Sequence, residues 1–273
     1  MSPDYFHTQD LIRDFEPRLD ERVFDRSLLI VGLGGNGTHL ALAAVRMGFR
    51  RVIGIDCDVV SPSNLSRQVL YTTADLGKQK AFAAQESLQR HNLRSQVETH
   101  DFNVLNDRQR FGSLVRETDL VFAVLDQVGT GFFVVDACHH LNKPAILGGT
   151  CVMSGLTTRV GWMVPGEGPC LNCAIPMHPD ANGWINFYRF DGGARKTKTA
   201  EAEKWDEEFS LAGGHPSTYP TACIGSNLMM AVALNLFIGR RDVPQLFEFS
   251  LLGMKLNQKK LEKRDQCPTC NRS

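Results

Sequence analysis

The chain has 273 residues, enough for one large domain or for one domain with an appendage. Aliphatic, aromatic and cysteine residues make up 42% of it and charged residues 22%, as in ordinary globular proteins. Thirty basic residues balance thirty acidic ones, so no overall positive field favours nucleic acid or acidic lipid as a partner.

The first segment, residues 1–26, is polar and acidic, which is wrong for a signal peptide. We expect a helical arm there, because apolar residues recur near helical spacing at Leu11, Ile12 and Phe15. No apolar run stands out as long enough for a membrane span. We therefore predict a cytoplasmic protein that has no membrane partner.

Residues 27–150 alternate short apolar runs with helical patterns. The expected strands are 27–31, 51–56, 97–100, 120–125 and 144–149, and the expected helices are 38–48, 77–91, 107–115 and 132–142. This alternation predicts βαβ units. Right-handed crossovers then place helices on both faces of a mainly parallel, doubly wound α/β sheet, which would form a nucleotide-binding core.

Residues 151–273 follow a different pattern. A strand is expected near 155–164, and the polar stretch 174–219 reads as a long, partly mobile loop. An apolar helix follows at about 221–238, and the run 246–258 predicts closing strands. We expect this part to add an antiparallel extension to the sheet.

The glycine-rich motif Gly-Leu-Gly-Gly-Asn-Gly at 32–37 follows the first strand and opens the first helix of the core. Its glycines permit a tight turn, and the helix N-terminus offers unpaired N–H groups to a phosphate. Asp56 ends the next strand, where a carboxylate accepts hydrogen bonds from ribose hydroxyls. The set predicts a dinucleotide or ATP, and a glycine turn without a ligand is the alternative.

A nicotinamide oxidoreductase is the usual inference from such a motif, but the next segment disfavours it. A second acid, Asp58, follows the strand, and Asn64, Arg67 and Lys80 come soon after. Cations of this kind neutralise the charge that develops when the bond between the α- and β-phosphates breaks. Asp126 ends another strand, where ligands bind in such sheets and where a carboxylate can hold Mg²⁺.

At these residues the sequence resembles the ThiF/MoeB type adenylyltransferases and the adenylation domains of ubiquitin-activating enzymes. The motifs are GLGGNG, IDCDVVSPSNLSRQ, GKQKA and AVLD, followed in order by PAILGG, PGEGPCLNC and CPTC. The resemblance covers about residues 20–173 and 220–271. It implies a Rossmann-like fold, ATP chemistry and a homodimer.

The resemblance also implies a role for each matched residue. The nucleotide-binding residues would be Gly32, Gly34, Gly35, Gly37, Asp56, Asp58, Asn64, Arg67, Gln68, Lys80 and Asp126. Arg67 and Lys80 would carry most of the transition-state stabilisation, and Asp126 would bind Mg²⁺. For Asp58 and Gln68 an alternative is equally open, namely a helix cap or a partner for buried backbone.

Two CxxC pairs, Cys170 with Cys173 and Cys267 with Cys270, predict a zinc site. In a reducing compartment such pairs indicate metal rather than disulfides, and four thiolates close a tetrahedral site. Because a closed site has no open position, we assign it to structure, tying the C-terminal tail to the core. Four free thiols are the alternative.

Cys223 is the candidate for a catalytic cysteine. Where the family places its acceptor, residues 212–216 contain no cysteine, and the nearest thiol is Cys223. It lies at the start of an apolar helix, whose N-terminus favours a thiolate, but a small buried side chain is the alternative. We expect Cys57, Cys138 and Cys151 to lie in the core.

The partner implied by the resemblance is a small ubiquitin-like or sulfur-carrier protein with a Gly-rich C-terminus, acting with a downstream conjugating enzyme or a sulfur donor. The long 174–219 segment and the missing acceptor favour bacterial ubiquitin-like conjugation slightly over sulfur transfer. The family commonly supplies an arginine from a neighbour's N-terminal arm, a role open here to Arg13 or Arg18 or to neither. A small-molecule or tRNA-linked carboxylate and an inactive binding scaffold remain alternatives.

Overall fold

The computed structural model describes residues 5–91, 94–151, 154–174, 190, 216–265, 267 and 269–270. These residues form one sheet of eight strands in the order β3-β2-β1-β4-β5-β6-β7-β8. The strands are β1 Ser27–Val31, β2 Arg51–Ile55, β3 Gln96–His100, β4 Leu120–Ala123, β5 Ala145–Thr150, β6 Thr157–Met163, β7 Leu246–Ser250 and β8 Lys255–Lys259. The first five run parallel, and β6, β7 and β8 extend the sheet antiparallel, as the sequence predicted.

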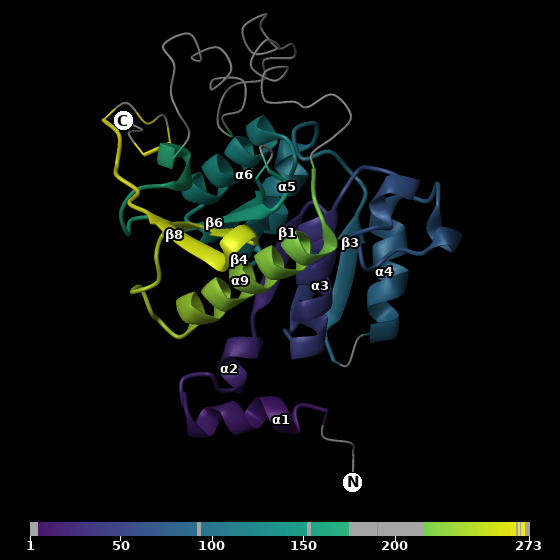
Figure 1. The fold of residues 1–273 in the computed structure, drawn as a ribbon, viewed down its shortest axis with the longest axis horizontal. Coiled ribbons are helices and arrows are strands. Elements are labelled where there is room, and N and C mark those ends of the chain that lie inside the picture. Colours follow the sequence, from purple (N-terminus) through teal and green to yellow (C-terminus); the bar gives the residue numbers. More distant parts are fainter. Residues whose placement is uncertain are drawn as a thin grey trace, which may run out of the picture.

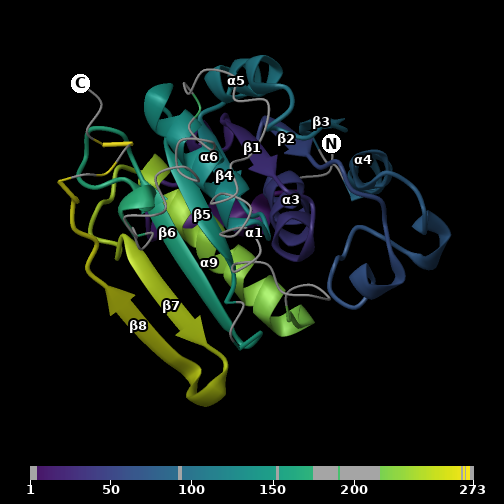
Figure 2. The ribbon, with the colours of Figure 1, turned by 90° about the horizontal axis from the view of Figure 1, so that it is seen from above.

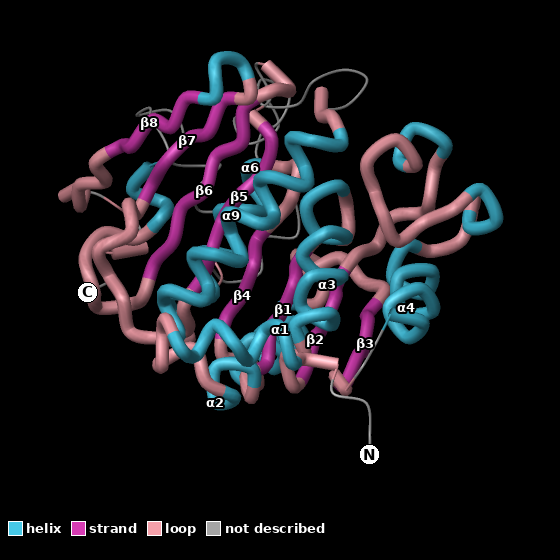
Figure 3. Tube along the Cα trace, turned by 60° about the horizontal axis from the view of Figure 1, so that its bottom comes forward, coloured by secondary structure: helices cyan, strands magenta, loops and turns pink. Residues whose placement is uncertain are grey.

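Helices cover both faces of the sheet (Figure 1 and Figure 3). They are α1 His7–Asp10, α2 Glu21–Phe24, α3 Gly35–Met47, α4 Lys80–His91, α5 Arg108–Arg116, α6 Val128–His140 and α9 Tyr219–Phe237. The helices α3, α4 and α9 share one face, and α5 and α6 lie on the other. The hairpin of β7 and β8 forms one edge of the sheet, as the view from above in Figure 2 shows.

Strand β1 shows why the central sheet is apolar on both sides. All five of its residues are buried, and its side chains alternate between two cores. Leu28 and Ile30 pack with the helices α3 and α9, whereas Leu29 and Val31 pack with α5 and α6. Burial on both faces accounts for the continuous apolar run in this strand.

The parallel strands carry their connections to a single edge of the sheet. The loops after β1, β2 and β4 all leave at the carboxyl ends of their strands, and they hold the predicted nucleotide-binding residues. The short helix α2 leads into the other end of β1, so the N-terminal arm lies at the opposite edge (Figure 1). Ligands bind at the carboxyl edge in sheets of this kind.

Three local expectations need correction. Helix α4 begins at Lys80 and not at Gly77, which adopts a left-handed φ of 82° and cannot open the helix. Cys57 is exposed in the turn after β2, and Cys151 is only half-buried after β5, so of the three cysteines expected in the core only Cys138 is fully buried.

Helix α9 is long and apolar enough to span a membrane by length and composition, contrary to the sequence-based expectation. Half of that apolar stretch is buried inside the protein. The helix packs on α3, β5 and β6, which accounts for its apolar sequence. Most of the predicted 174–219 loop lies outside the described residues.

Candidate functional site

The glycine loop at the carboxyl end of β1 is shaped by backbone that approaches too closely for side chains. Gly32 has a φ of 97°, and a Cβ there would lie 2.5 Å from the carbonyl oxygen of Val124. A Cβ on Gly37 would overlap the carbonyl oxygen of Gly32. The turn therefore requires both glycines, and it opens directly into α3, whose first N–H groups face out of the turn.

Asp56 fastens this loop to the end of β2. One carboxylate oxygen accepts a hydrogen bond from the Leu33 amide at 2.7 Å, and the other accepts from the Asp58 amide at 2.9 Å. Burial raises the pKa of Asp56, and the nearby Lys80 cation opposes that rise. The carboxylate is thus held against the glycine loop, at the position where a ribose would meet it.

Lys80, the first residue of α4, lies between the two acids of the β2 loop. Its ammonium is 2.8 Å from a carboxylate oxygen of Asp58 and 4.0 Å from one of Asp56, and its side chain is only 8% exposed. A carboxylate in direct contact offsets part of the cost of burying such a side chain. The ion pair therefore lies beside Asp56, which holds the glycine loop.

The segment that follows β2 brings Arg67 and Gln68 back over the start of α3. The nearest side-chain carbon of Arg67 would be 3.5 Å from a Cβ on Gly35, and its guanidinium donates to the Ser63 carbonyl at 2.9 Å. Gln68 is 3% exposed, and its carbonyl oxygen has no hydrogen-bond partner among the described residues. Both side chains therefore border the glycine loop at the start of α3.

Two other predicted residues have looser positions. The carbonyl oxygen of Asn64 accepts from the Ser61 amide at 3.0 Å and caps a short 3₁₀ turn. Asp126 is exposed between β4 and α6, two residues beyond Val124, whose carbonyl abuts Gly32. No direct contact joins Asp126 to the acids or lysine in the part of the chain described.

The glycine loop is also held by residues that no local sequence motif identifies. The Tyr71 hydroxyl donates to the Leu33 carbonyl at 2.9 Å, and burial raises the pKa of that phenol. The Asn36 amide donates to the Ala222 carbonyl at 3.1 Å, and Ser226 donates back to the Asn36 carbonyl at 2.9 Å. These contacts tie the loop to α9, a helix distant in sequence, which no local motif encodes.

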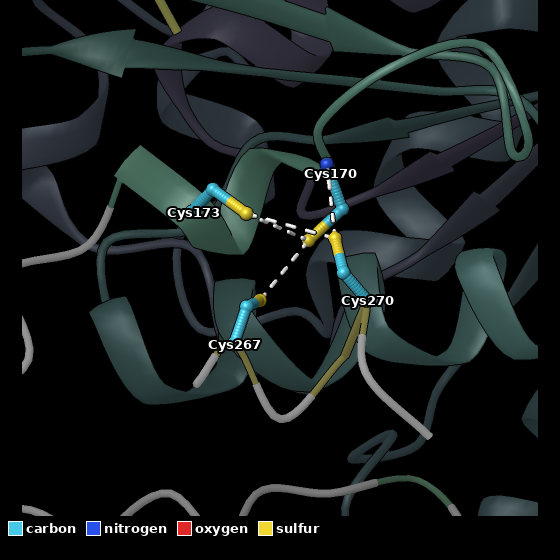
Figure 4. A group of neighbouring side chains, drawn as sticks. All are labelled: Cys170, Cys173, Cys267 and Cys270. Carbon is cyan, nitrogen blue, oxygen red and sulfur yellow. Dashed lines mark hydrogen bonds between the residues drawn. The ribbon is translucent and has the colours of Figure 1, made fainter. Parts of the chain in front are cut away.

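The four cysteines of the two CxxC pairs lie close together (Figure 4). Their sulfur atoms all lie within 4.8 Å of one another. The sulfur of Cys170 is 3.9 Å from that of Cys173 and 3.6 Å from that of Cys267, and Cys173 lies 3.6 Å from Cys270. Four sulfurs at about 2.3 Å from a tetrahedral zinc ion would be about 3.8 Å apart, so the cluster fits this metal.

The surroundings of the cluster also suit a thiolate site. The backbone amide of Cys170 donates to the sulfur of Cys270 at 3.4 Å. A hydrogen bond from the Cys170 thiol lowers the pKa of Cys267. Cys170 and Cys267 are fully buried, which leaves no position for a substrate. The four cysteines could hold a metal ion as a closed, structural site.

Cys223 lies in the first half of α9 and is half-buried. The side-chain amide of Asn227 approaches its sulfur at 3.5 Å. The preceding residue, Ala222, would be 3.4 Å from a Cβ on Gly35, so this turn of α9 borders the glycine loop. Among the described residues, no hydrogen bond or ion pair joins Cys223 itself to the nucleotide residues.

Known proteins share this fold and these motifs. The model of the ThiF family matches residues 7–269. A sulfur carrier protein adenylyltransferase of Thermus thermophilus is 34% identical over 178 residues, which cover 64% of this chain and 65% of that protein. An adenylyltransferase and sulfurtransferase MOCS3 of Drosophila persimilis is 33% identical over 188 residues, which cover 69% of this chain and 40% of that protein.

Solved structures agree on the fold. The crystal structure of E. coli MccB with MccA-N7isoASN superposes with a TM-score of 0.76 at 21% identity, over 98% of this chain and 75% of that one. The selenomethionine structure of PaaA gives a TM-score of 0.64 at 23% identity, over 93% of this chain and 69% of that one. The chain thus matches under two thirds of the curated relatives' length, but the family profile spans nearly all of it, and the protein belongs to the ThiF family.

Proposed function

We propose that this chain is an ATP-dependent adenylyltransferase. Its substrate would be the C-terminal carboxylate of a small ubiquitin-like or sulfur-carrier protein. The observation that carries the proposal is the buried Lys80 ammonium, held by Asp58 beside the glycine loop. A nicotinamide site has no need of a cation there, whereas a triphosphate does. The relatives named as adenylyltransferases support the same reading.

The reaction follows from the charges at the carboxyl edge of the sheet. The glycine loop and the α3 N-terminus would hold the phosphates, and Asp56 would accept from the ribose hydroxyls. A carboxylate oxygen of the partner attacks the α-phosphorus, the bond to the bridging oxygen of the β-phosphate breaks, and pyrophosphate leaves. The product is an acyl-adenylate. Arg67 and Lys80 would neutralise the charge that develops on the phosphate oxygens.

Magnesium would enter with the nucleotide. Mg²⁺ usually keeps its waters and binds through one or two carboxylates together with substrate phosphates. Asp126 suits that role, because its exposed carboxylate follows the backbone that abuts Gly32. The ion would supply electrostatic stabilisation of the phosphates, and Asp126 would hold it beside the loop.

Zinc would have a structural role. The buried cysteine cluster joins the 170–173 turn to the 267–270 turn and offers no open coordination position. It would hold the C-terminal tail against α6. We therefore assign no chemical step to it.

The fate of the acyl-adenylate depends on the branch of the family. Transfer to Cys223 would release AMP and form a thioester, in line with ubiquitin-like conjugation, which we favour slightly over sulfur transfer. A conjugating enzyme or a sulfur donor would act next. We also propose a cytoplasmic homodimer. The arm lies at the edge opposite this chain's glycine loop, so an arginine from it would serve a neighbour's site (Figure 1).

The test is ATP–pyrophosphate exchange with and without a small protein that ends in Gly-Gly and is encoded nearby. Exchange that depends on that protein would establish both the reaction and the partner. Exchange with a small-molecule or tRNA-linked acid instead would leave adenylation standing and replace the partner. ATP binding without exchange for any acid would point to a binding scaffold and overturn the proposal.

A further inference from the structure

A buried carboxylate lies between the cysteine cluster and the segment that precedes α9. Asp136 lies on α6 and is 0% exposed. One of its oxygens accepts from the Thr269 hydroxyl at 2.7 Å, and the other accepts from the Phe190 amide at 2.8 Å. A single side chain thus contacts two pieces of chain that are distant in sequence.

Thr269 belongs to the C-terminal cysteine turn. It lies between Cys267 and Cys270 and is itself fully buried. Its hydroxyl, which donates to Asp136, also accepts from the side-chain amide of Asn172 at 3.0 Å. Asn172 lies inside the other CxxC pair, so the hydroxyl connects both halves of the cluster to the carboxylate. Metal-binding turns depend on contacts of this kind for the orientation of their ligands.

Phe190 is seated in a socket on the same face of the sheet. Its ring lies 5.7 Å from the rings of Phe133 and His140, both on α6. A Cβ on Gly112 of α5 would be 2.9 Å from the tip of the Phe190 ring, so the socket exists because residue 112 is a glycine. The ring and the amide together fix this residue against α5 and α6.

We propose that Asp136 couples zinc binding to the seating of Phe190. Thr269 holds one carboxylate oxygen while the other accepts from the Phe190 amide, and zinc would hold the Thr269 turn in place. Coupling between two sites is reciprocal, so a seated Phe190 must strengthen zinc binding by the same factor by which zinc favours seating. Contacts of this class change metal affinity by about 10- to 100-fold.

The inference requires zinc in the cysteine cluster but not the proposed adenylation. Its measurements are zinc release and proteolysis, so its failure and the failure of the proposed reaction would be distinguishable. Trypsin cleaves after arginine, and the bond between Arg189 and Phe190 is such a site. Phe190 must leave its contacts with α5 and α6 before trypsin can cleave at this bond, so the cleavage rate reports the release of Phe190.

The first experiment compares zinc-loaded and chelator-treated protein. Removal of zinc should raise the rate of cleavage at the Arg189–Phe190 bond about tenfold or more, measured by mass spectrometry. The Thr269→Val variant, which loses the hydroxyl, should show a similar rise while zinc is still bound. Thr269→Ser retains the hydroxyl and should behave as the natural protein does.

The second experiment runs in the opposite direction. Phe190→Ala should release zinc to a chromophoric chelator about tenfold faster, and Phe15→Ala, which removes a 90% exposed ring elsewhere, should not. Cleavage that stays constant when zinc is removed from the natural protein would overturn the coupling. Unchanged zinc release from Phe190→Ala would overturn it as well, whether or not the Thr269 variants fold.

Discussion

The nucleotide site and the cysteine cluster draw their residues from the sequence in different ways. At the nucleotide edge, the glycine loop, Asp56 and Lys80 come from one stretch of sequence, residues 32–80, and contacts within that stretch hold them together. The cysteine cluster joins turns from residues 170–173 and 267–270 and is closed. The first is a local motif at the edge of the sheet, whereas the second depends on tertiary contact between two distant segments. Substitutions at the nucleotide site and loss of zinc from the cluster should therefore have different effects on ATP binding and on stability.

The largest effect is expected for Lys80→Met. Loss of the buried cation should lower the rate of pyrophosphate exchange about 100- to 1,000-fold, because the charge on the phosphates is no longer neutralised. Lys78→Met is a matched control, since Lys78 is half-exposed and bridges to Asp75. It should stay within about threefold of the natural protein. Equal losses in both variants would show that Lys80 has no special role.

The same variant makes a prediction about pH. Burial raises the pKa of Asp56 and Lys80 opposes this, so the methionine variant should raise that pKa further. The ribose would be bound by the ionised carboxylate. As pH falls, ATP affinity should therefore be lost at a higher pH in Lys80→Met than in the natural protein, measured by nucleotide titration. An unshifted acid limb would separate Asp56 from ribose binding.

A smaller effect, on binding alone, is expected for Gly37→Ala. The added methyl overlaps the Gly32 carbonyl, so the loop must open, and ATP should bind about 100-fold more weakly. Gly131→Ala is a control in another helix, where the new methyl would meet only a Leu147 side chain at 3.5 Å. ATP binding by Gly131→Ala should be unchanged. A Gly37→Ala protein that binds ATP normally would mean that the loop does not hold the phosphates.

Zinc removal tests whether the cysteine cluster and the nucleotide site are independent. Without metal the C-terminal tail is no longer joined to the 170–173 turn, and the midpoint of thermal unfolding should fall by roughly 10 °C. ATP affinity should change by less than about threefold, since no described contact joins the cysteines to the glycine loop. Calorimetry and nucleotide titration on the same sample measure both. Loss of ATP binding together with the loss of stability would show that the cysteine cluster and the nucleotide site are coupled.

What the sequence could predict follows the same division. The strand–glycine–helix pattern and the acid Asp56 were readable because their geometry is set by neighbours in the chain. The CxxC pairs were readable because metal chemistry restricts the spacing of ligands. Tyr71, Asn36 and Asp136 carried no signal, because their partners are chosen by tertiary packing.

The sequence-based expectations were wrong where one sequence pattern is compatible with two structures. Cys57 lies between two acids, directly after the expected strand 51–56. The strand instead ends at Ile55, and Cys57 is exposed in the turn. The apolar sequence of α9 likewise fits either a membrane or a protein core, and its packing on α3 and the sheet identifies the second.

The smallest effect on adenylation is expected for Cys223→Ala. The sulfur makes no described contact with the nucleotide residues, so pyrophosphate exchange should stay within about twofold.

If the thiolate attacks the acyl-adenylate, AMP leaves and a thioester to the carrier remains. That adduct, seen on a non-reducing gel and removed by dithiothreitol, should be absent from Cys223→Ala and present in Cys57→Ala, which lacks the exposed thiol after β2. An adduct that persists in Cys223→Ala would assign the acceptor to another cysteine. Loss of exchange in that variant would instead place Cys223 in the nucleotide site, since its neighbour Ala222 would lie 3.4 Å from a Cβ on Gly35.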